Sequence, residues 1–131
     1  MKHPGVGRPA EARRRANRTG RRAEWVAALL LTLKGYRIIA RGFTVTGGEI
    51  DIVARRGSVL VFVEVKARPG LDEALLAVDG VKRRRVARAA AVWLARNPWA
   101  ASLDFRGDAV LMAPKHWPRH VIDAFPVEIG W

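Results

Sequence analysis

An almost unbroken apolar run, Val59 to Val65, constrains the fold of this chain more than any other segment. Valine-rich runs of this length are typical of a strand that is covered on both faces of a sheet. The run is followed by a break at Arg68-Pro69-Gly70, so the strand cannot extend much further. We therefore expect this segment to be the central strand of the domain.

The remaining pattern predicts an α/β fold in which helices flank this sheet. Further strands are expected at 36–46, 49–54, 107–112 and 121–129, and helices at 17–34 and 79–96. Residues 71–78 are expected to form a loop or a short helix. The order is therefore α-β-β-β-α-β-β, with a meander of the first three strands and a helical crossover to the fourth.

The first helix is expected to begin at Asn17 or Thr19 and to end at Gly35. Its middle, Trp25 to Leu33, is apolar around most of its circumference, which predicts that it is largely buried. The apolar stretch is far shorter than the ~20 residues that span a bilayer, so we expect no membrane segment. Residues 1–16, rich in Pro, Gly and Arg, predict a basic flexible arm before a single domain at 17–131.

The strong positive charge points to a polyanionic partner. The chain has 24 Lys and Arg against 12 Asp and Glu, a net charge of +12. The excess lies in two patches: one in residues 1–22, which includes Arg21 and Arg22, and one made of Lys82, Arg83, Arg84, Arg85 and Arg88. A nucleic acid, most simply DNA, is the favoured partner, with an anionic membrane surface as the rival. The absence of cysteine excludes disulfides and thiolate chemistry and fits the cytoplasm.

Two carboxylates and a lysine are expected to meet at the end of the central strand. Because side chains alternate along a strand, Glu64 and Lys66 share a face. A hairpin centred on Arg56-Gly57 brings Asp51 opposite one of residues 62–64, and so close to Glu64. Facing carboxylates repel unless a cation lies between them, and oxygen ligands favour Mg²⁺ or Mn²⁺.

The same motifs carry a family resemblance. They are Gly48-Glu49-Ile50-Asp51 and Phe62-Val63-Glu64-Val65-Lys66, which together resemble the PD-(D/E)xK nuclease motif. From about Gly20 to Met112 the chain resembles the YraN-like family of predicted endonucleases, which is similar to archaeal Holliday-junction resolvases. The match includes Gly20-Arg21-Arg22-Ala23-Glu24, Lys34-Gly35-Tyr36 and Lys82. It departs at Arg41-Gly42-Phe43, where the family often has Arg-Asn.

The resemblance implies a restriction-endonuclease-like fold and a metal-dependent DNA endonuclease that acts on branched or structured DNA. It implies that Glu24, Asp51 and Glu64 are metal ligands, that the carbonyl of Val65 is another, and that Lys66 is the catalytic lysine. A resolvase would be a homodimer, which the sequence permits. The structural alternative is an ion-pair cluster at a strand end. Glu24 could likewise pair with neighbouring arginines on its helix.

The cations at the start of the second helix give an independent hint of phosphate binding. They stand where the helix dipole disfavours positive charge, a local cost that bound phosphates would offset. Helical spacing directs Lys82 towards the body as a phosphate clamp and directs Arg84 and Arg88 elsewhere. The alternative is an ordinary solvated charged face.

Two other functions stay open on the sequence: a silent nucleic-acid-binding module of the same fold, and an RNA-associated factor. Minor candidates are weaker. Pro118 interrupts a zinc pair of His116 and His120. Trp99 is expected to pack rather than to stack on bases, and Asp108 to pair with Arg106.

Overall fold

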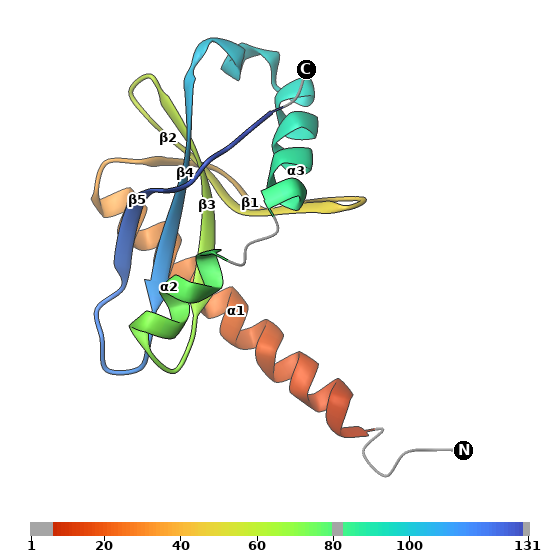
Figure 1. Ribbon diagram of the computed structural model, residues 1–131, viewed down its shortest axis with the longest axis vertical. Coiled ribbons are helices and arrows are strands. Elements are labelled where there is room, and N and C mark those ends of the chain that lie inside the picture. Colours follow the sequence, from red (N-terminus) through yellow and green to blue (C-terminus); the bar gives the residue numbers. More distant parts are fainter. Residues whose placement is uncertain (1–6, 80–82, 130–131) are drawn as a thin grey trace.

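The computed structural model describes residues 7–79 and 83–129 as one mixed sheet with helices on both faces (Figure 1). Its elements are α1 (Gly7–Leu33), β1 (Arg37–Val45), β2 (Gly48–Arg56), β3 (Val59–Ala67), α2 (Leu71–Asp79), α3 (Arg83–Arg96), the 3-10 helix η1 (Pro98–Ser102), β4 (Asp104–Met112) and β5 (Arg119–Phe125). The α/β class and the expected order of elements are confirmed. Residues 71–78, left open on the sequence, belong to helix α2.

The five strands follow one another across the sheet in the order β1-β2-β3-β4-β5. The pairs β1–β2, β2–β3 and β4–β5 are antiparallel. Strand β4 runs parallel to β3, which the crossover through α2 and α3 makes possible. The apolar run that begins at Val59 is therefore the central strand, as the sequence predicts.

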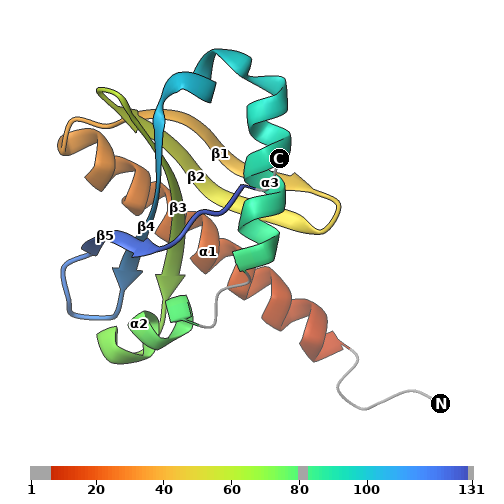
Figure 2. The same cartoon turned by 45° about the horizontal axis from the view of Figure 1, so that its top comes forward.

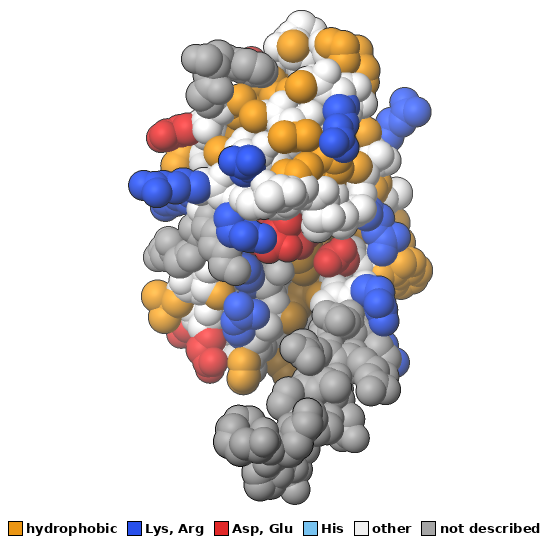
Figure 3. Space-filling view, turned by 90° about the vertical axis from the view of Figure 1, so that its right-hand side faces the viewer, with side chains coloured by type: hydrophobic (Ala, Val, Ile, Leu, Met, Phe, Trp, Pro, Cys, Tyr) orange, Lys and Arg blue, Asp and Glu red, His pale blue; other side chains and the backbone are white. Residues whose placement is uncertain are grey.

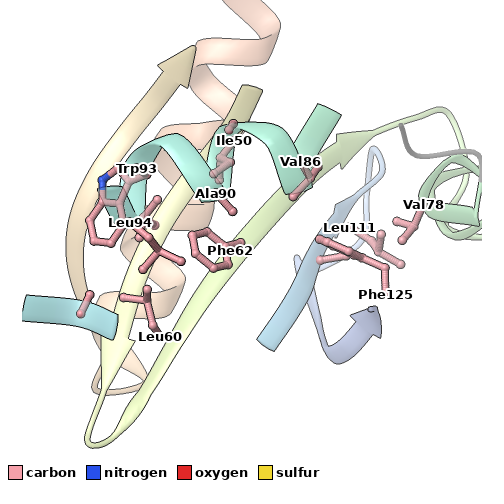
Figure 4. Close-up of a cluster of buried hydrophobic side chains, with 14 of the residues drawn as sticks. Ile50, Leu60, Phe62, Val78, Val86, Ala90, Trp93, Leu94, Leu111 and Phe125 are labelled. Carbon is pink, nitrogen blue, oxygen red and sulfur yellow. The ribbon is translucent and has the colours of Figure 1, made fainter. Parts of the chain in front are cut away.

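Each face of the sheet has its own hydrophobic core. On one face α3 packs Trp93 and Leu94 against Leu60 and Phe62 of β3 (Figure 4). On the other face α1 packs Leu31 and its neighbours against the alternate β3 residues Val61 and Val63. Side chains of β3 thus point alternately into two buried layers, which explains the unbroken apolar sequence.

A glycine lets α3 lie directly on the start of β2. A Cβ atom on Gly48 would stand 2.5 Å from the carbonyl oxygen of Arg85 and 2.9 Å from the backbone nitrogen of Ala89. No side chain fits that gap, so the helix approaches the strand only because residue 48 is glycine. This contact positions α3 beside the strand that carries Asp51.

Helix α1 differs from the sequence expectation at its start and in its burial. It begins at Gly7, well before Asn17 or Thr19, because the alanines and arginines of this segment are strong helix formers and Pro9 falls in the first turn, where proline is tolerated. It ends before Gly35, whose φ of +93° is the left-handed conformation expected of a helix terminator.

Between Gly20 and Leu33, where the side chains of α1 are described, only one side of the helix is buried, contrary to the prediction that its apolar middle is enclosed. Ala27 and Leu31 are fully buried against the sheet, whereas Trp25, Leu29 and Leu33 are 57%, 44% and 77% exposed. The helix lies in an outer layer, so the sheet covers one stripe of it and no described element covers the other. Among the residues that the structure describes, no helix combines the length and apolarity needed to cross a bilayer.

Strand β5 stops earlier than expected and ends at Phe125. Pro126 follows directly, and proline cannot donate the hydrogen bond that the sheet ladder would need there. Within β4, Gly107 allows the backbone of Phe125 to approach, since a Cβ at this position would stand 2.5 Å from its carbonyl oxygen.

Candidate metal and nucleic-acid site

Asp51 occupies the point where β2 and β3 separate. The backbone ladder between these strands runs from Arg56–Val59 to Ile52–Val63 and ends there. Beyond it, the carboxylate of Asp51 accepts a hydrogen bond of 2.8 Å from the backbone N–H of Val65. Continuing the ladder by one residue brings Asp51 level with Glu64, which is one of the three registers that the hairpin allowed.

Strand β2 twists strongly at this point. Ile50 packs into the core under α3, whereas Ile52 packs into the core under α1. Strict alternation would place both residues on one face, so the sheet does not follow the simple pattern here. This change of packing side falls where the ladder between β2 and β3 ends, next to the Asp51 carboxylate.

Glu64 is a buried acid that lies beside Lys66. It is only 7% exposed, and Oε2 lies 3.5 Å from Nζ of Lys66 on the same face of β3. Burial, and after it the negative charge of Asp51, raise the pKa of Glu64 from 4.5 to about 7, against the opposing effect of Lys66. This carboxyl therefore changes its protonation state near neutral pH.

Two further acids near this position, Asp51 and Glu24, also have raised pKa values. Burial raises the pKa of Asp51, although the hydrogen bond from Val65 and the charge of Lys66 act in the opposite direction. Burial and then the charge of Asp51 raise the pKa of Glu24, while Arg41 lowers it. Glu24 of α1, Asp51 of β2 and Glu64 of β3 therefore form one electrostatically repulsive group, here called the acidic cluster.

The donor set fits a Mg²⁺-like ion held by few protein ligands. No three His, Cys, Asp or Glu side chains in the described part of the chain lie close enough to one another to enclose a metal ion. Mg²⁺ in phosphate-handling sites is usually held by one or two carboxylates, with waters and substrate phosphates completing its shell. Asp51 and Glu64 would supply those carboxylates, and a cation between them would offset the repulsion by which Asp51 raises the pKa of Glu64.

Basic side chains surround acidic ones on one face of the molecule. Figure 3 shows acidic side chains in a recess near the middle of this face, with Lys and Arg side chains on either side. Such a surface combines an anionic centre, suited to a metal, with a cationic surround, suited to phosphates.

The four arginines in the first half of α3 divide into two pairs. Arg85 lies 3.6 Å from Glu49, and Nε of Arg88 donates a 2.6 Å hydrogen bond to the carbonyl of Thr46, so this pair holds the β1–β2 turn. Arg83 and Arg84 are exposed and line a small cleft of about 180 Å³ beside Pro126 and Glu128. Arg83 and Arg84 are therefore better placed than Arg85 and Arg88 to bind a phosphate of a nucleic acid. Lys82, the expected clamp, lies outside the described residues.

The basic patch expected in residues 1–22 ends close to Glu24. Arg21 and Arg22 are exposed on α1. Arg22 and Arg68 lie at an open apolar hollow of about 480 Å³ whose other lining residues are Ala23, Ala67, Pro69, Met112, Ala113 and Pro114. These cations flank the same end of the sheet that carries Lys66.

A buried polar network, most of which the sequence does not indicate, lies on the α1 face of β4. Asp108 is fully buried. It accepts hydrogen bonds of 2.7 and 2.8 Å from Arg106 and one of 3.0 Å from the backbone of Asp123, and Nε2 of His120 lies 2.7 Å from it. Burial favours the protonated acid, yet the bonds from His120 and Arg106 hold the pKa of Asp108 down at about 2.

This network extends at both ends. Arg106 also donates to the hydroxyl of Tyr36, and Nζ of Lys34 lies 2.6 Å from Nδ1 of His120. The expected pairing of Asp108 with Arg106 is confirmed. Nε2 of His120 contacts the carboxylate of Asp108, and His116 is exposed. The two histidines therefore do not form a zinc-binding pair. Only the short separation of Arg106 and Asp108 was visible in the sequence.

These observations define an α/β protein with a mixed five-stranded sheet and an acidic cluster beside a lysine at the end of its central strands. The chain belongs to the uncharacterised protein family UPF0102, whose model matches residues 23–112. This confirms the resemblance to the YraN-like family. The matched span contains Glu24, Asp51, Glu64 and Lys66.

Bacterial relatives match nearly the whole chain. A UPF0102 protein of Methylobacterium nodulans is 58% identical over 121 residues, covering 92% of this chain and 94% of the relative. One of Methylocella silvestris is 54% identical over 123 residues, covering 94% and 99%. One of Paramagnetospirillum magneticum is 47% identical over 124 residues, covering 92% and 96%.

Proposed function

We propose that this protein is a cytoplasmic, Mg²⁺- or Mn²⁺-dependent DNA endonuclease that hydrolyses phosphodiester bonds at the acidic cluster. The observation that carries the proposal is the pairing of two largely buried carboxylates, Asp51 and Glu64, with Lys66 at the fork of β2 and β3. Burying like charges side by side is costly without a cation, so the arrangement is difficult to explain as a purely structural ion pair.

In this proposal Asp51 and Glu64 hold the metal together with the Val65 carbonyl. Glu24 does not lie close enough to enclose an ion with them, so it would become a further ligand only through a movement of its side chain. The bound ion would polarise a phosphoryl oxygen and lower the pKa of a bound water. The N–H of Val65 fixes the Asp51 carboxylate, so this ligand needs little rearrangement on binding. Both carboxylates must be ionised to bind the ion, which couples binding to the raised pKa of Glu64.

Lys66 has the position to act on the phosphate. Its Nζ lies 3.5 Å from Glu64, so a phosphate held at these carboxylates would come within reach of the ammonium group. The ammonium would donate a hydrogen bond to a non-bridging oxygen and stabilise the charge that develops as water attacks phosphorus. Arg83, Arg84, Arg21 and Arg22 would bind flanking phosphates, since all are exposed.

The test is cleavage of labelled DNA by the purified protein with Mg²⁺, with Mn²⁺ and with EDTA. Single-stranded, duplex, flapped and four-way-junction substrates run in parallel, because branched DNA is the substrate that the family resemblance favours. Glu64→Gln and Lys66→Ala are the variants, and Asp104→Asn is the matched control, because Asp104 is an exposed acid that pairs with Val59 at the other end of β3 from Glu64. We expect metal-dependent cleavage that both site variants lose and the control keeps.

The second candidate is a DNA-binding module without turnover. It is favoured by the finding that no three potential metal-binding side chains in residues 7–79 and 83–129 come together. This candidate predicts salt-sensitive binding without cleavage under either metal, and equal binding by wild type and Glu64→Gln. Paired cuts across a junction by an endonuclease would further require a homodimer, which sedimentation of the protein with and without junction DNA would reveal.

A further inference from the structure

A second hollow, of about 390 Å³, lies away from the acidic cluster. Its lining residues are Arg37, Ile38 and Ile39 of β1, Arg55 of β2 and Trp99 of η1. Arg55 stands four residues along β2 from Asp51, which corresponds to roughly 13 Å of extended strand. The hollow therefore lies at the other end of the β1–β2 pair from the fork that carries Asp51.

An exposed aromatic ring forms one wall of this hollow. Trp99 is 49% exposed although it packs edge-on against the buried Trp93, with ring centroids 6.0 Å apart. The guanidinium of Arg55 lies over the Trp99 ring, 5.7 Å from its centroid. Nε of Arg55 donates a 2.8 Å hydrogen bond to the carbonyl of Gly57, which fixes the position of the guanidinium. The result is an aromatic surface that carries a positive charge.

Two arginines stand directly opposite each other across the strands at this point. Arg37 pairs with Arg55 in the β1–β2 register. Like charges in directly opposed positions destabilise a sheet. Neither arginine forms an ion pair with an acid in the described part of the chain. A bound anion would offset this repulsion. The unfavourable placement of the two arginines therefore indicates that an anionic ligand binds here.

We propose that Arg37, Arg55 and Trp99 form a binding site for an unpaired nucleotide of a single-stranded nucleic acid. The base packs against the Trp99–Arg55 surface and the apolar side chains of β1, and a neighbouring phosphate accepts hydrogen bonds from Arg37 and Arg55. The inference deepens the proposed function, on which it rests only in taking a nucleic acid as the partner. It does not depend on cleavage.

The aromatic ring distinguishes an unpaired nucleotide from a duplex as the ligand. Phosphates on the outside of a duplex would need only the arginines, and duplex bases are already stacked on one another. The hollow instead has an exposed indole beside two arginines that form no ion pair with the described acids. This combination is typical of sites in which proteins stack single-stranded bases. A substrate with unpaired nucleotides near the cut would thus contact both the hollow and the acidic cluster.

The experiment measures fluorescence anisotropy of labelled oligothymidylate, oligouridylate and a short duplex with the full chain in EDTA, where cleavage cannot occur. Trp99→Leu and Arg55→Gln are the test variants. Their matched controls are Trp117→Leu, because Trp117 is 91% exposed, and Arg119→Gln, because Arg119 is an exposed arginine on β5. Circular dichroism checks that each variant is folded, and Arg55→Gln remains informative if Trp99→Leu unfolds.

We expect both test variants to weaken oligothymidylate binding roughly tenfold, and to leave duplex binding within about twofold, because one base–aromatic contact is lost. A stronger effect on oligouridylate would identify RNA as the natural polymer and would still support the site. Equal losses in the test and control variants would overturn the proposal, as would a wild type that does not bind either single strand. If only the endonuclease proposal fails, the test variants would still bind oligothymidylate more weakly than the control variants, but neither Mg²⁺ nor Mn²⁺ would support cleavage.

Discussion

The carboxylate of Asp51 accepts a 2.8 Å hydrogen bond from the backbone N–H of Val65, at the position where the backbone ladder between β2 and β3 has ended. One side chain thus performs two tasks, since it holds the fork of the two strands and presents its charge towards Glu64. The tasks are separable by mutation because an amide oxygen can accept the same hydrogen bond without the charge.

Asp51→Asn is therefore expected to abolish metal-dependent DNA cleavage and to preserve the fold. Loss of one of two repelling buried charges should leave the free energy of unfolding unchanged or higher, whereas Asp51→Ala should lower it by about 1–3 kcal/mol because the N–H of Val65 loses its partner. Urea unfolding in EDTA measures the stability, and the cleavage assay measures the activity. If Asp51→Asn and Asp51→Ala destabilise the protein equally, the hydrogen bond from Val65 to residue 51 does not stabilise this end of β2 and β3.

The raised pKa of Glu64 predicts how stability depends on pH. Burial and the charge of Asp51 lift this pKa from 4.5 to about 7, so between these values the folded protein keeps a proton that the unfolded chain has released. The free energy of unfolding in EDTA should thus fall as pH rises from about 4.5 through 7, by at most roughly 3 kcal/mol.

Urea titrations across this pH range, for wild type and Glu64→Gln, test this effect. The variant cannot ionise at residue 64, so its pH dependence should be flatter and its stability at alkaline pH higher than that of wild type. Mg²⁺ affinity of the wild type should rise with pH over the same interval, because the ion binds the ionised carboxylates. Identical pH profiles for the two proteins would show that Glu64 is not the titrating group.

Contact between Gly48 and α3 predicts a large effect of one added methyl group. Gly48→Ala would place a Cβ 2.5 Å from the carbonyl oxygen of Arg85, so α3 must shift, and we expect a loss of about 1–3 kcal/mol in urea unfolding. Gly20→Ala is the matched control, since nothing lies within 4 Å of its added Cβ and alanine favours the helix by roughly 1 kcal/mol. Opposite signs for the two substitutions are therefore expected.

The exposed arginines of α3 should contribute to DNA binding through phosphate contacts alone. Arg83→Ala and Arg84→Ala should each lower the slope of log affinity against log salt by about one unit, with little effect on which DNA is preferred. Arg96→Ala, at the other end of the same helix, is the control because Arg96 instead lies over Phe43. An unchanged salt slope in both test variants would show that these arginines are merely solvated.

The central strand and the acidic cluster could be predicted because local patterns determine them. A strand that is apolar on both faces is stable only in the interior of a sheet. The short hairpin at Gly57 allows few registers between β2 and β3, and all of them bring Asp51 near Glu64. The charges at Glu64 and Lys66 stand out because they end this apolar strand. No long-range information was needed for these two conclusions.

The features that escaped prediction depend on tertiary packing. The exposed stripe at Trp25, Leu29 and Leu33 could not be inferred from an apolar helix, since exposure depends on how many layers cover it. The twist that sends Ile50 and Ile52 to different cores arises where the ladder ends. The Asp108–His120 contact joins residues from different strands, and sequence spacing carries no signal for it.

This Asp108 network should serve the fold and not the reaction, because Arg106, His120 and the backbone of Asp123 enclose the Asp108 carboxylate, and its charge is not among those that shift the pKa values of Asp51 and Glu64. Asp108→Ala would leave the buried side chain of His120 and the half-buried Arg106 without their acceptor, and the loss of one partner of a buried pair costs about 3–5 kcal/mol. The pKa of Asp108, about 2 against an ordinary 3.8, further predicts that its stabilising effect is present above pH 3.8 and is lost as pH falls through 2.

Urea unfolding of wild type and Asp108→Asn at neutral and acidic pH tests this assignment. The difference in unfolding free energy between the two proteins should be largest near neutral pH and should shrink as pH approaches 2, because the wild-type carboxylate is then protonated and resembles the amide. Folded Asp108→Asn, assayed below its melting temperature, should keep the DNA cleavage that Glu64→Gln loses. Loss of cleavage by this variant while it remains folded would instead make Asp108 part of the reaction site.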